Sequence, residues 1–284
     1  MFHIQNRNGF INSHQSGINR RPSAVSQILK VLHEKPEKEA AYRLEGFSFS
    51  VANKPEDLTR CYSLAYQEYY KKGYVTEHVP NKMIISEHDS DKATMVVMAK
   101  DENQKIVGTL SIVVDGMRGL PCDELFYNEL IKLRQNGSRI AEVVRLAISD
   151  EYKNSKEILV GMFNLVCNYV KNIAKCSDLI IEVNPRHVKY YQRLLLFKVI
   201  SEEKECKRVE GAPAVLLCLK KQDVENYQKY YSYDKDYLRS LHPHLSKGKE
   251  EMQLAKMIFD EMSKVTKEIL EKSGVTVQNQ LQLI

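Results

Sequence analysis

The sequence predicts an α/β protein with a mixed β-sheet, helices on both faces of the sheet, and a helical C-terminal extension. Three observations lead to this prediction. Between residues 42 and 220, runs with the period of strands alternate with runs with the period of helices. Two strand runs flank a short polar turn, which is typical of an antiparallel hairpin. The 284 residues are 43% hydrophobic and 28% charged, as in a globular chain with a sizeable core.

The first part of this region predicts a strand, a helix and a hairpin. Polar and apolar residues alternate over Arg43–Val51, as in a strand. Pro55 and the two acids after it open a helix that ends near Gly73. The β-rich runs Thr94–Ala99 and Ile106–Val114 then form the hairpin across the polar residues between them.

The second part predicts helices that alternate with strands. The longest helix has its apolar residues at the helical period, so one face of it should cover the core. A strand, a short helix and a last strand follow it. In chain order the elements are Asp123–Gln135, Ile140–Ser149, Lys156–Lys175, Leu179–Val183, a helix that ends at Leu196, and Ala214–Leu219.

The two flanks have other patterns. Residues 1–41 begin with an acid-poor stretch, which predicts a flexible N-terminal extension with a short helix near Ser26–His33; a transit peptide is the alternative. Residues 221–284 predict a helical C-terminal extension, so the enzyme-like domain spans residues 42–220. The extension contains the amphipathic stretch Gln253–Ser273, whose balanced charges favour docking on the domain or a homodimer over a membrane surface.

Charge, apolar runs and cysteines exclude several classes of protein. The net charge is only +5 and forms no concentrated basic run, so no nucleic-acid partner is expected. No apolar run is long enough for a transmembrane segment. The six cysteines are scattered, as is typical of reduced thiols in a cytoplasmic protein. Neither they nor His242 and His244 predict a metal site.

Four segments, in this order along the chain, resemble one family. They are Tyr66–Val75, Leu120–Phe126, Ile140–Ile148 and Asn184–Phe197. The third reads Ile-Ala-Glu-Val-Val-Arg-Leu-Ala-Ile, and the fourth begins Asn-Pro-Arg-His and continues as a tyrosine-led helix. Their order and spacing resemble the long-chain N-acyl amino acid synthases of the FeeM type, within the Gcn5-related acyltransferase superfamily. The Glu-x-x-Arg pair in the third segment also resembles the acyl-homoserine-lactone synthases.

The resemblance implies the Gcn5-related N-acyltransferase fold and an N-acyl amino acid synthase. Such an enzyme moves a medium- or long-chain acyl group from an acyl carrier protein thioester to the amine of an amino acid. Two alternatives remain, a coenzyme A-dependent N-acetyltransferase and a catalytically silent acyltransferase fold that acts as a binding module. The resemblance implies no tightly bound cofactor, because the acyl-phosphopantetheine thioester is a co-substrate.

The loop after the third segment favours the carrier protein as donor. Ordinary acetyltransferases of the superfamily hold the pyrophosphate of coenzyme A there with a glycine-rich backbone. Residues Asp150–Ile158 contain no glycine, and their three acidic side chains would repel a pyrophosphate. The phosphopantetheine of a carrier protein has a single phosphate, so it tolerates the loss of this loop.

Glu142 is the expected general base, and Arg145 is expected to hold the carboxylate of the acceptor. Burial would raise the pKa of Glu142 and make it a better base near neutrality. Side chains three residues apart in a regular strand face opposite sides, so paired roles require a β-bulge between these two residues. The alternatives are a surface Glu142 paired with a lysine and an Arg145 that only pairs with Glu142.

The resemblance also implies contacts to the acyl donor. They are the backbone N–H groups near the end of the central strand, as oxyanion donors, and a residue of the fourth segment: Leu146, Ala147, Ile148 and Asn184. Basic residues near the expected donor entrance could dock an acidic carrier protein, or they are ordinary solvated charges. These are Lys153, Lys156, Arg186, Lys189 and Arg193.

Three further positions have open roles. Tyr191, or its neighbour Tyr190, could protonate the leaving thiolate or belong to the core. Asp123 could orient Arg145 or the acceptor, or it could cap a helix. Leu196 stands where the family has glycine, so the local backbone is expected to differ there.

Overall fold

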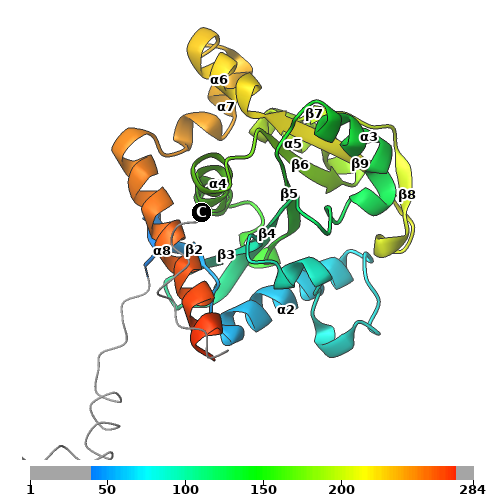
Figure 1. Ribbon diagram of the computed structural model, residues 1–284, viewed down its shortest axis with the longest axis vertical. Coiled ribbons are helices and arrows are strands. Elements are labelled where there is room, and N and C mark those ends of the chain that lie inside the picture. Colours follow the sequence, from blue (N-terminus) through cyan, green and yellow to red (C-terminus); the bar gives the residue numbers. More distant parts are fainter. Residues whose placement is uncertain (1–39, 273–284) are drawn as a thin grey trace, which may run out of the picture. The chain divides into compact units, whose positions relative to one another are not determined.

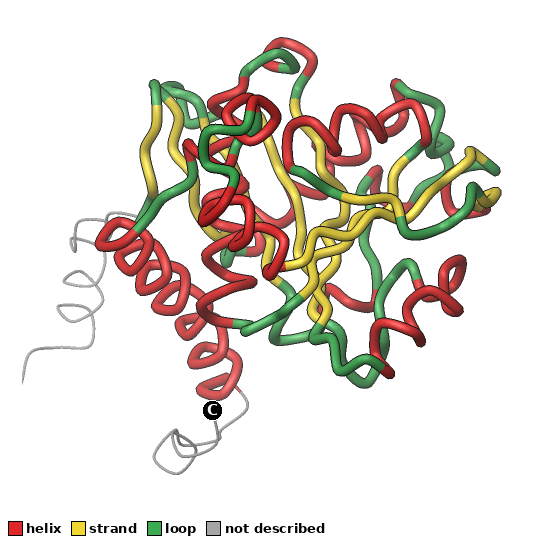
Figure 2. The backbone as a smooth tube through the Cα atoms, turned by 90° about the horizontal axis from the view of Figure 1, so that it is seen from above, coloured by secondary structure: helices red, strands yellow, loops and turns green. Residues whose placement is uncertain are grey.

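Residues 40–272 of the chain are described by a computed structural model. Within that range nine strands form one sheet in the order β1-β2-β3-β4-β5-β6-β9-β7, and β8 also pairs with β9. Only β5 and β6 are parallel; the other neighbours are antiparallel. Helices lie on both sides of the strands (Figures 1 and 2). The predicted fold class is confirmed, whereas the N-terminal extension and its helix lie outside the described residues.

The elements follow the predicted order closely. The strands are β1 (Tyr42–Leu44), β2 (Phe47–Val51), β3 (Met95–Lys100), β4 (Ile106–Val114), β5 (Ile140–Ile148), β6 (Asp178–Val183), β7 (Lys198–Val199), β8 (Lys204–Cys206) and β9 (Ala212–Lys220). The helices are α2 (Pro55–Lys71), α3 (Asp123–Gln135), α4 (Lys156–Asn168), α5 (Val188–Leu195), α6 (Lys221–Tyr230), α7 (Lys235–Arg239) and α8 (Gly248–Lys272).

The first predicted strand is instead a hairpin. Glu45 and Gly46 both have positive φ, 46° and 80°, which makes the two-residue turn that matches the twist of antiparallel strands. The chain therefore reverses inside Arg43–Val51, and β1 pairs with β2. The alternating pattern continues through the turn, so periodicity alone did not reveal it. The strands β7 and β8 were also missed, because two or three residues are too short to show a period.

The two faces of the sheet are covered by different helices. Buried residues of α4, such as Ile158 and Phe163, pack on one face, while α2 and α3 pack on the other. At Gly161 in α4 the helix backbone lies close to the sheet, since an added Cβ would be 2.2 Å from the ring of Phe49 on β2. Glycine at this position lets the helix rest directly on the sheet.

The C-terminal extension packs on the domain. Leu254 and Ile258 of α8 are buried in the same apolar cluster as α4, and α8 runs alongside α4 and β2 (Figure 1). Docking of the extension is therefore confirmed, and this part of its apolar face is not free for a homodimer contact. No helix among residues 40–272 is long and apolar enough to cross a membrane.

Candidate active site

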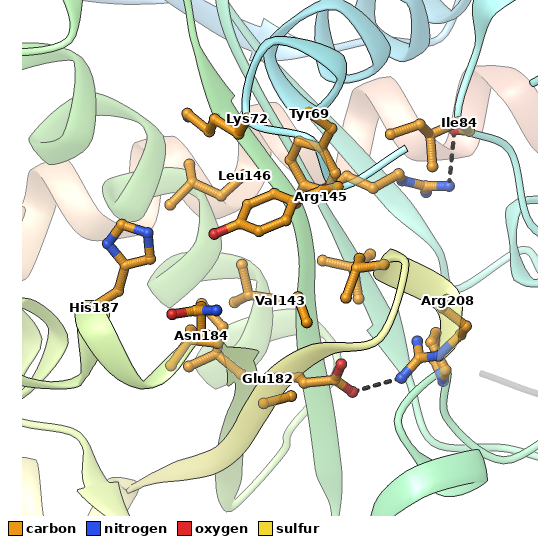
Figure 3. A pocket seen from close by; sticks show the side chains of 18 of the residues that line it. Tyr69, Lys72, Ile84, Val143, Arg145, Leu146, Glu182, Asn184, His187 and Arg208 are labelled. Carbon is orange, nitrogen blue, oxygen red and sulfur yellow. Dashed lines mark hydrogen bonds and ion pairs between the residues drawn. The ribbon is translucent and has the colours of Figure 1, made fainter. Parts of the chain in front are cut away.

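The two parallel strands part near the centre of the sheet. β5 and β6 are paired from Ile140 opposite Asp178 to Val143 opposite Ile181, and both strands continue beyond that point without pairing to each other. A pocket of about 610 Å³ lies at this gap (Figure 3). Its volume is within the range of small-molecule sites. Its walls come from both strands, from α2 and the segment after it, from α5, and from the β8–β9 connection.

A β-bulge brings Glu142 and Arg145 to the same pocket. The register of β5 on β4 shifts by one residue between Val144 and Ala147, and Arg145 has a left-handed φ of 57°. The extra residue reverses the alternation of side chains, so Arg145 lies on the face that Glu142 occupies. Both side chains line the pocket. The predicted bulge is confirmed.

Arg145 is bound by an aspartate that the sequence reasoning missed. Its two terminal nitrogens donate to the two carboxylate oxygens of Asp89, with Nη1 2.6 Å from Oδ2. The guanidinium also lies 5.0 Å from the ring centre of Tyr62. Asp89 occupies both terminal nitrogens that an acceptor carboxylate would need. Arg145 therefore does not offer the expected two-pronged contact to the acceptor. The alternative, a pair with Glu142, is also not formed.

Glu142 is almost fully buried at the pocket wall. It is 1% exposed, and its Oε2 accepts a hydrogen bond from the backbone N–H of Cys122 at 3.1 Å. Burial raises the pKa of Glu142 to about 7; the hydrogen bond from Cys122 opposes this rise, and the nearby charge of Glu182 adds to it. The alternative of a surface glutamate paired with a lysine is therefore wrong. A carboxyl with this pKa can exchange a proton near neutral pH.

Asp123 does not orient Arg145. It is the first residue of α3, and it accepts from the backbone N–H of Leu120 at 2.7 Å. Its carboxylate also binds Arg134, with Nη1 2.6 Å from Oδ1. These contacts fix the start and the body of α3, and Asp123 does not line the pocket. The expected cap role is wrong, because Cys122 occupies the N-cap position and Asp123 lies inside the helix. Asp89, and not Asp123, holds Arg145.

An ion pair that the sequence reasoning missed lies beside Glu142. Arg208, in the short turn between β8 and β9, donates through Nη2 to Oε2 of Glu182 on β6 at 2.5 Å (Figure 3). The thiol of Cys206 donates to the other oxygen of Glu182 at 3.1 Å. Glu182 and Arg208 both line the pocket. Their pairing joins segments without a periodic pattern, so only the tertiary structure reveals it.

Tyrosines form another wall of the pocket. Tyr191 lines it together with Tyr69, Tyr74 and Tyr190, and its ring packs edge-on against Phe197. Burial raises the pKa of Tyr191, and burial also raises the pKa of Tyr69 to about 12. These phenols are therefore protonated at neutral pH and can act as donors. Tyr190 is 46% exposed, so Tyr191 is the more enclosed of the two expected candidates.

The expected donor contacts lie along the open edge of β5. Leu146, Ile148 and Asn184 line the pocket, whereas Ala147 is buried and does not. β5 has no partner on its β6 side in this stretch, so the backbone groups of alternate residues point into the gap. The side chain of Asn184 caps the turn that follows it by accepting from the N–H of Arg186.

Basic residues gather on the side of the pocket opposite Arg208. Lys72 and His187 line the pocket there, well separated from Arg208 (Figure 3), and Lys153 lines it from the loop whose Asp150 pairs with Lys71, the neighbour of Lys72. Burial and the nearby charge of Arg186 lower the pKa of His187. Arg186 itself lies over the ring of Tyr74, at 5.3 Å. Lys72 was not among the residues expected from the sequence.

The other expected docking residues lie outside the pocket. Lys156 contacts His244, with Nζ 3.1 Å from Nε2, and thus joins α4 to the C-terminal extension. Lys189 and Arg193 are exposed on α5. The five residues expected from the sequence therefore form no single cluster inside the pocket.

Two of the three acids in the loop after β5 are paired with lysines. Asp150 lies 3.3 Å from the ammonium of Lys71, and Glu151 lies 2.9 Å from that of Lys105. Glu157 accepts from the hydroxyl of Ser155 at the start of α4. The repulsion of a pyrophosphate is therefore weaker than the sequence alone indicated.

The sheet order and the parting of its parallel strands define the fold as that of the Gcn5-related N-acyltransferases. The solved structure of FeeM, an N-acyl amino acid synthase from uncultured soil microbes, has a TM-score of 0.52 and 24% sequence identity to this chain, and it covers 64% of this chain and 92% of its own. TofI, solved in a ternary complex with an inhibitor and MTA, has a TM-score of 0.48 and 15% identity over 61% and 90% of the two chains. The ribosomal-protein-S5-alanine acetyltransferase from Vibrio fischeri has a TM-score of 0.46 and 14% identity over 65% and 98%.

The family follows from the sequence comparison. Residues 60–220, more than half of the chain, match the N-acyl amino acid synthase FeeM family, and the chain belongs to that family. It is therefore an N-acyltransferase. A search of curated proteins found no match.

Proposed function

We propose that this enzyme transfers a medium- or long-chain acyl group from the phosphopantetheine thioester of an acyl carrier protein to the amine of an amino acid. The observation that carries the proposal is Glu142, a buried carboxyl with a pKa of about 7 on the wall of a pocket between parted strands. Amide formation needs a base of this strength beside the acceptor nitrogen.

The proposed reaction balances without a cofactor. The amine nitrogen attacks the thioester carbon, a C–N bond forms and the C–S bond breaks. The acceptor enters as an ammonium, and Glu142 takes one proton from it, which frees the lone pair that attacks. The nitrogen of the tetrahedral intermediate releases a second proton to solvent, and the phenol of Tyr191 gives a proton to the leaving thiolate and regains one from solvent. Glu142 then loses its proton to solvent, so one H⁺ is released for each amide formed. Backbone N–H groups of Leu146 to Ile148 stabilise the oxyanion in this proposal.

Arg145 has a positioning role in this proposal. Its pair with Asp89 fixes the bulge that turns the end of β5 toward the gap. A buried two-pronged pair keeps one geometry, and a fixed geometry lets the backbone donors face the reacting carbonyl. Asn184 then lies across the gap from this edge, where the thioester arm would pass.

The carrier protein remains the preferred donor, and acyl-coenzyme A is the second candidate. The loop after β5 has no glycine to approach a pyrophosphate, which favours the single phosphate of the carrier protein. The pairing of Asp150 and Glu151 with lysines favours the alternative, because it lowers the repulsion. Both donors bring a phosphate to the side of the pocket where Lys72 and Lys153 lie.

The test supplies purified protein with a panel of twenty amino acids and three donors: one long acyl chain on carrier protein, the same chain on coenzyme A, and acetyl-coenzyme A. We expect N-acyl amino acid by mass spectrometry, with higher kcat/KM for the carrier-protein donor. Glu142→Gln should lower kcat/KM by roughly 10²- to 10⁴-fold. Glu129→Gln is the matched control, because Glu129 pairs with Lys204 and does not line the pocket.

Absence of any N-acyl product with either donor would overturn the proposal. Product formed only with acetyl-coenzyme A would replace it by the acetyltransferase alternative. An unchanged rate in Glu142→Gln would remove Glu142 as the base and leave the acyltransferase assignment intact.

A further inference from the structure

Arg208 lies on the pocket wall near Glu142 and Glu182, and the proposed reaction does not use it. Arg208 reaches Glu182 through Nη2, and its Nε lies 3.3 Å from Oε2 of Glu124, an exposed side chain. Among the described residues, its Nη1 has no hydrogen-bond partner. Arg208 is close enough to Glu142 for its positive charge to lower the pKa of that carboxyl, against the effect of burial.

The other cations on the pocket wall are already assigned or lie elsewhere. Arg145 is 8% exposed and its fork is bound by Asp89. Lys72 and Lys153 lie on the opposite side, where the donor phosphate is expected. Arg208 is therefore the cation next to Glu142 whose terminal nitrogen Nη1 has no partner among the described residues, whereas both terminal nitrogens of Arg145 are bound by Asp89.

We propose that Arg208 binds the carboxylate of the acceptor, and that the acceptor ammonium lies against Glu142 and Glu182. This inference rests on the proposed function. An α-amino acid carries its ammonium and its carboxylate on the same carbon, and the Glu182–Arg208 pair presents the complementary charges side by side. The Nη1 group of Arg208 can donate a charge-assisted hydrogen bond to that carboxylate. The site thus selects acceptors with a free carboxylate and rejects simple amines and amides.

The pocket wall around Arg208 fits acceptors with apolar side chains. The pocket next to Arg208 is lined by Val209, Ala212, Pro213 and Ala214, which offer apolar contacts and no further charge. L-leucine and L-phenylalanine are therefore suitable probes, and their carboxamides are the matched ligands that lack only the charge.

Calorimetry tests the inference without turnover. The protein is first saturated with an acyl-pantetheine thioether, and each probe is then titrated. We expect wild type to bind the amino acids roughly 10- to 100-fold more tightly than the carboxamides, since one charged hydrogen-bonded contact is lost in the amide. Arg208→Met should bind both weakly and equally, and Arg208→Lys should fall between. Arg139→Met is the control, because Arg139 is exposed and binds only a backbone carbonyl outside the pocket.

Steady-state kinetics add a second readout. Arg208→Met should raise the KM for the amino acid by the same factor and leave the KM for the donor unchanged. A variant with a disordered site would raise both KM values.

Wild type that binds acid and amide equally, or binds neither, overturns the inference, even if Arg208→Met fails to fold. A preference for the acid that survives in Arg208→Met also overturns it. If wild type shows the preference but forms no product, the proposed function fails and the acceptor site stands.

Discussion

The two sides of the pocket differ in whether their charged side chains are paired. On one side every charged group that we assign is buried or already paired: Glu142 with a backbone N–H, Arg145 with Asp89, and Arg208 with Glu182. On the other side Lys72 and Lys153 are exposed, and neither has a carboxylate partner among the described residues. The paired side is preorganised for a small acceptor and for proton transfer. The open side leaves positive charge available to a ligand that brings its own phosphate.

The largest effect is expected from breaking the Arg145–Asp89 pair. Asp89→Asn leaves a buried guanidinium without its counter-charge, which should lower the free energy of unfolding by about 3 to 5 kcal/mol. Urea denaturation measures this loss. The control is Asp91→Asn, because Asp91 pairs with Arg118 near the surface and such pairs contribute less than about 1 kcal/mol. Equal losses in the two variants would contradict a preorganised paired side.

The raised pKa of Glu142 should also make the stability of the protein depend on pH. Its carboxyl titrates near 7 in the folded chain and near its ordinary value of 4.5 when unfolded, so the folded state binds more protons between these values. The sign of linkage then makes stability fall as pH rises through this window, by about 3 kcal/mol in all. Glu142→Gln removes this loss, so its stability relative to wild type should grow between pH 4.5 and 8.

Urea denaturation at pH 5 and pH 8 checks this growth. Glu129→Gln, which removes a carboxylate paired with Lys204, should show no such gain at pH 8. A stability difference between wild type and Glu142→Gln that does not change with pH would mean that Glu142 is not desolvated.

The same carboxyl should set the pH dependence of the reaction. Because the base must be unprotonated, kcat/KM should rise about tenfold per pH unit below 7 and level off above it. The measurement is a rate profile from pH 5 to 9 at saturating donor. Glu142→Gln should lack the limb near pH 7, and a limb that persists there would assign the base to another group.

The sequence predicted the parts of this site that lie on one strand, and missed those that meet across the fold. The spacing of Glu142 and Arg145 led to the predicted bulge, because strand parity allows no other shared face. Asp89 lies 56 residues from Arg145, in the four-residue 3₁₀ helix Glu87–Ser90, which is too short to give a periodic signal. Arg208 reaches Glu182 from a turn after a three-residue strand. Pairings of this kind depend on which distant segments the tertiary structure brings together, so a local sequence pattern does not encode them.

Leu196 shows the same limit at the level of the backbone. It takes the place of the family's glycine, and the sequence led us to expect a different local geometry. Leu196 nevertheless adopts φ 62° at the end of α5, the left-handed conformation that glycine favours. Its side chain is buried in the main core, and that burial offsets a left-handed penalty of about 1 kcal/mol. The core therefore overrides the local preference of the residue.

The smallest effect, on the open side, separates a phosphate contact from carrier-protein docking. Lys72→Glu and Lys153→Glu should raise the KM for an acyl carrier protein donor several-fold without changing kcat, because they reverse charge where the phosphate enters. Lys189→Glu and Arg193→Glu, on the exposed face of α5, should act only if the acidic carrier protein docks there. Effects on exposed charges should shrink at 0.5 M salt, since the screening length falls to roughly 4 Å.

If acyl-coenzyme A responds to Lys72→Glu and Lys153→Glu but not to the α5 variants, the first pair binds phosphate and α5 binds the carrier protein. If none of the four variants changes either KM, the open side is ordinary solvated charge, and the contrast between the two sides loses its functional meaning.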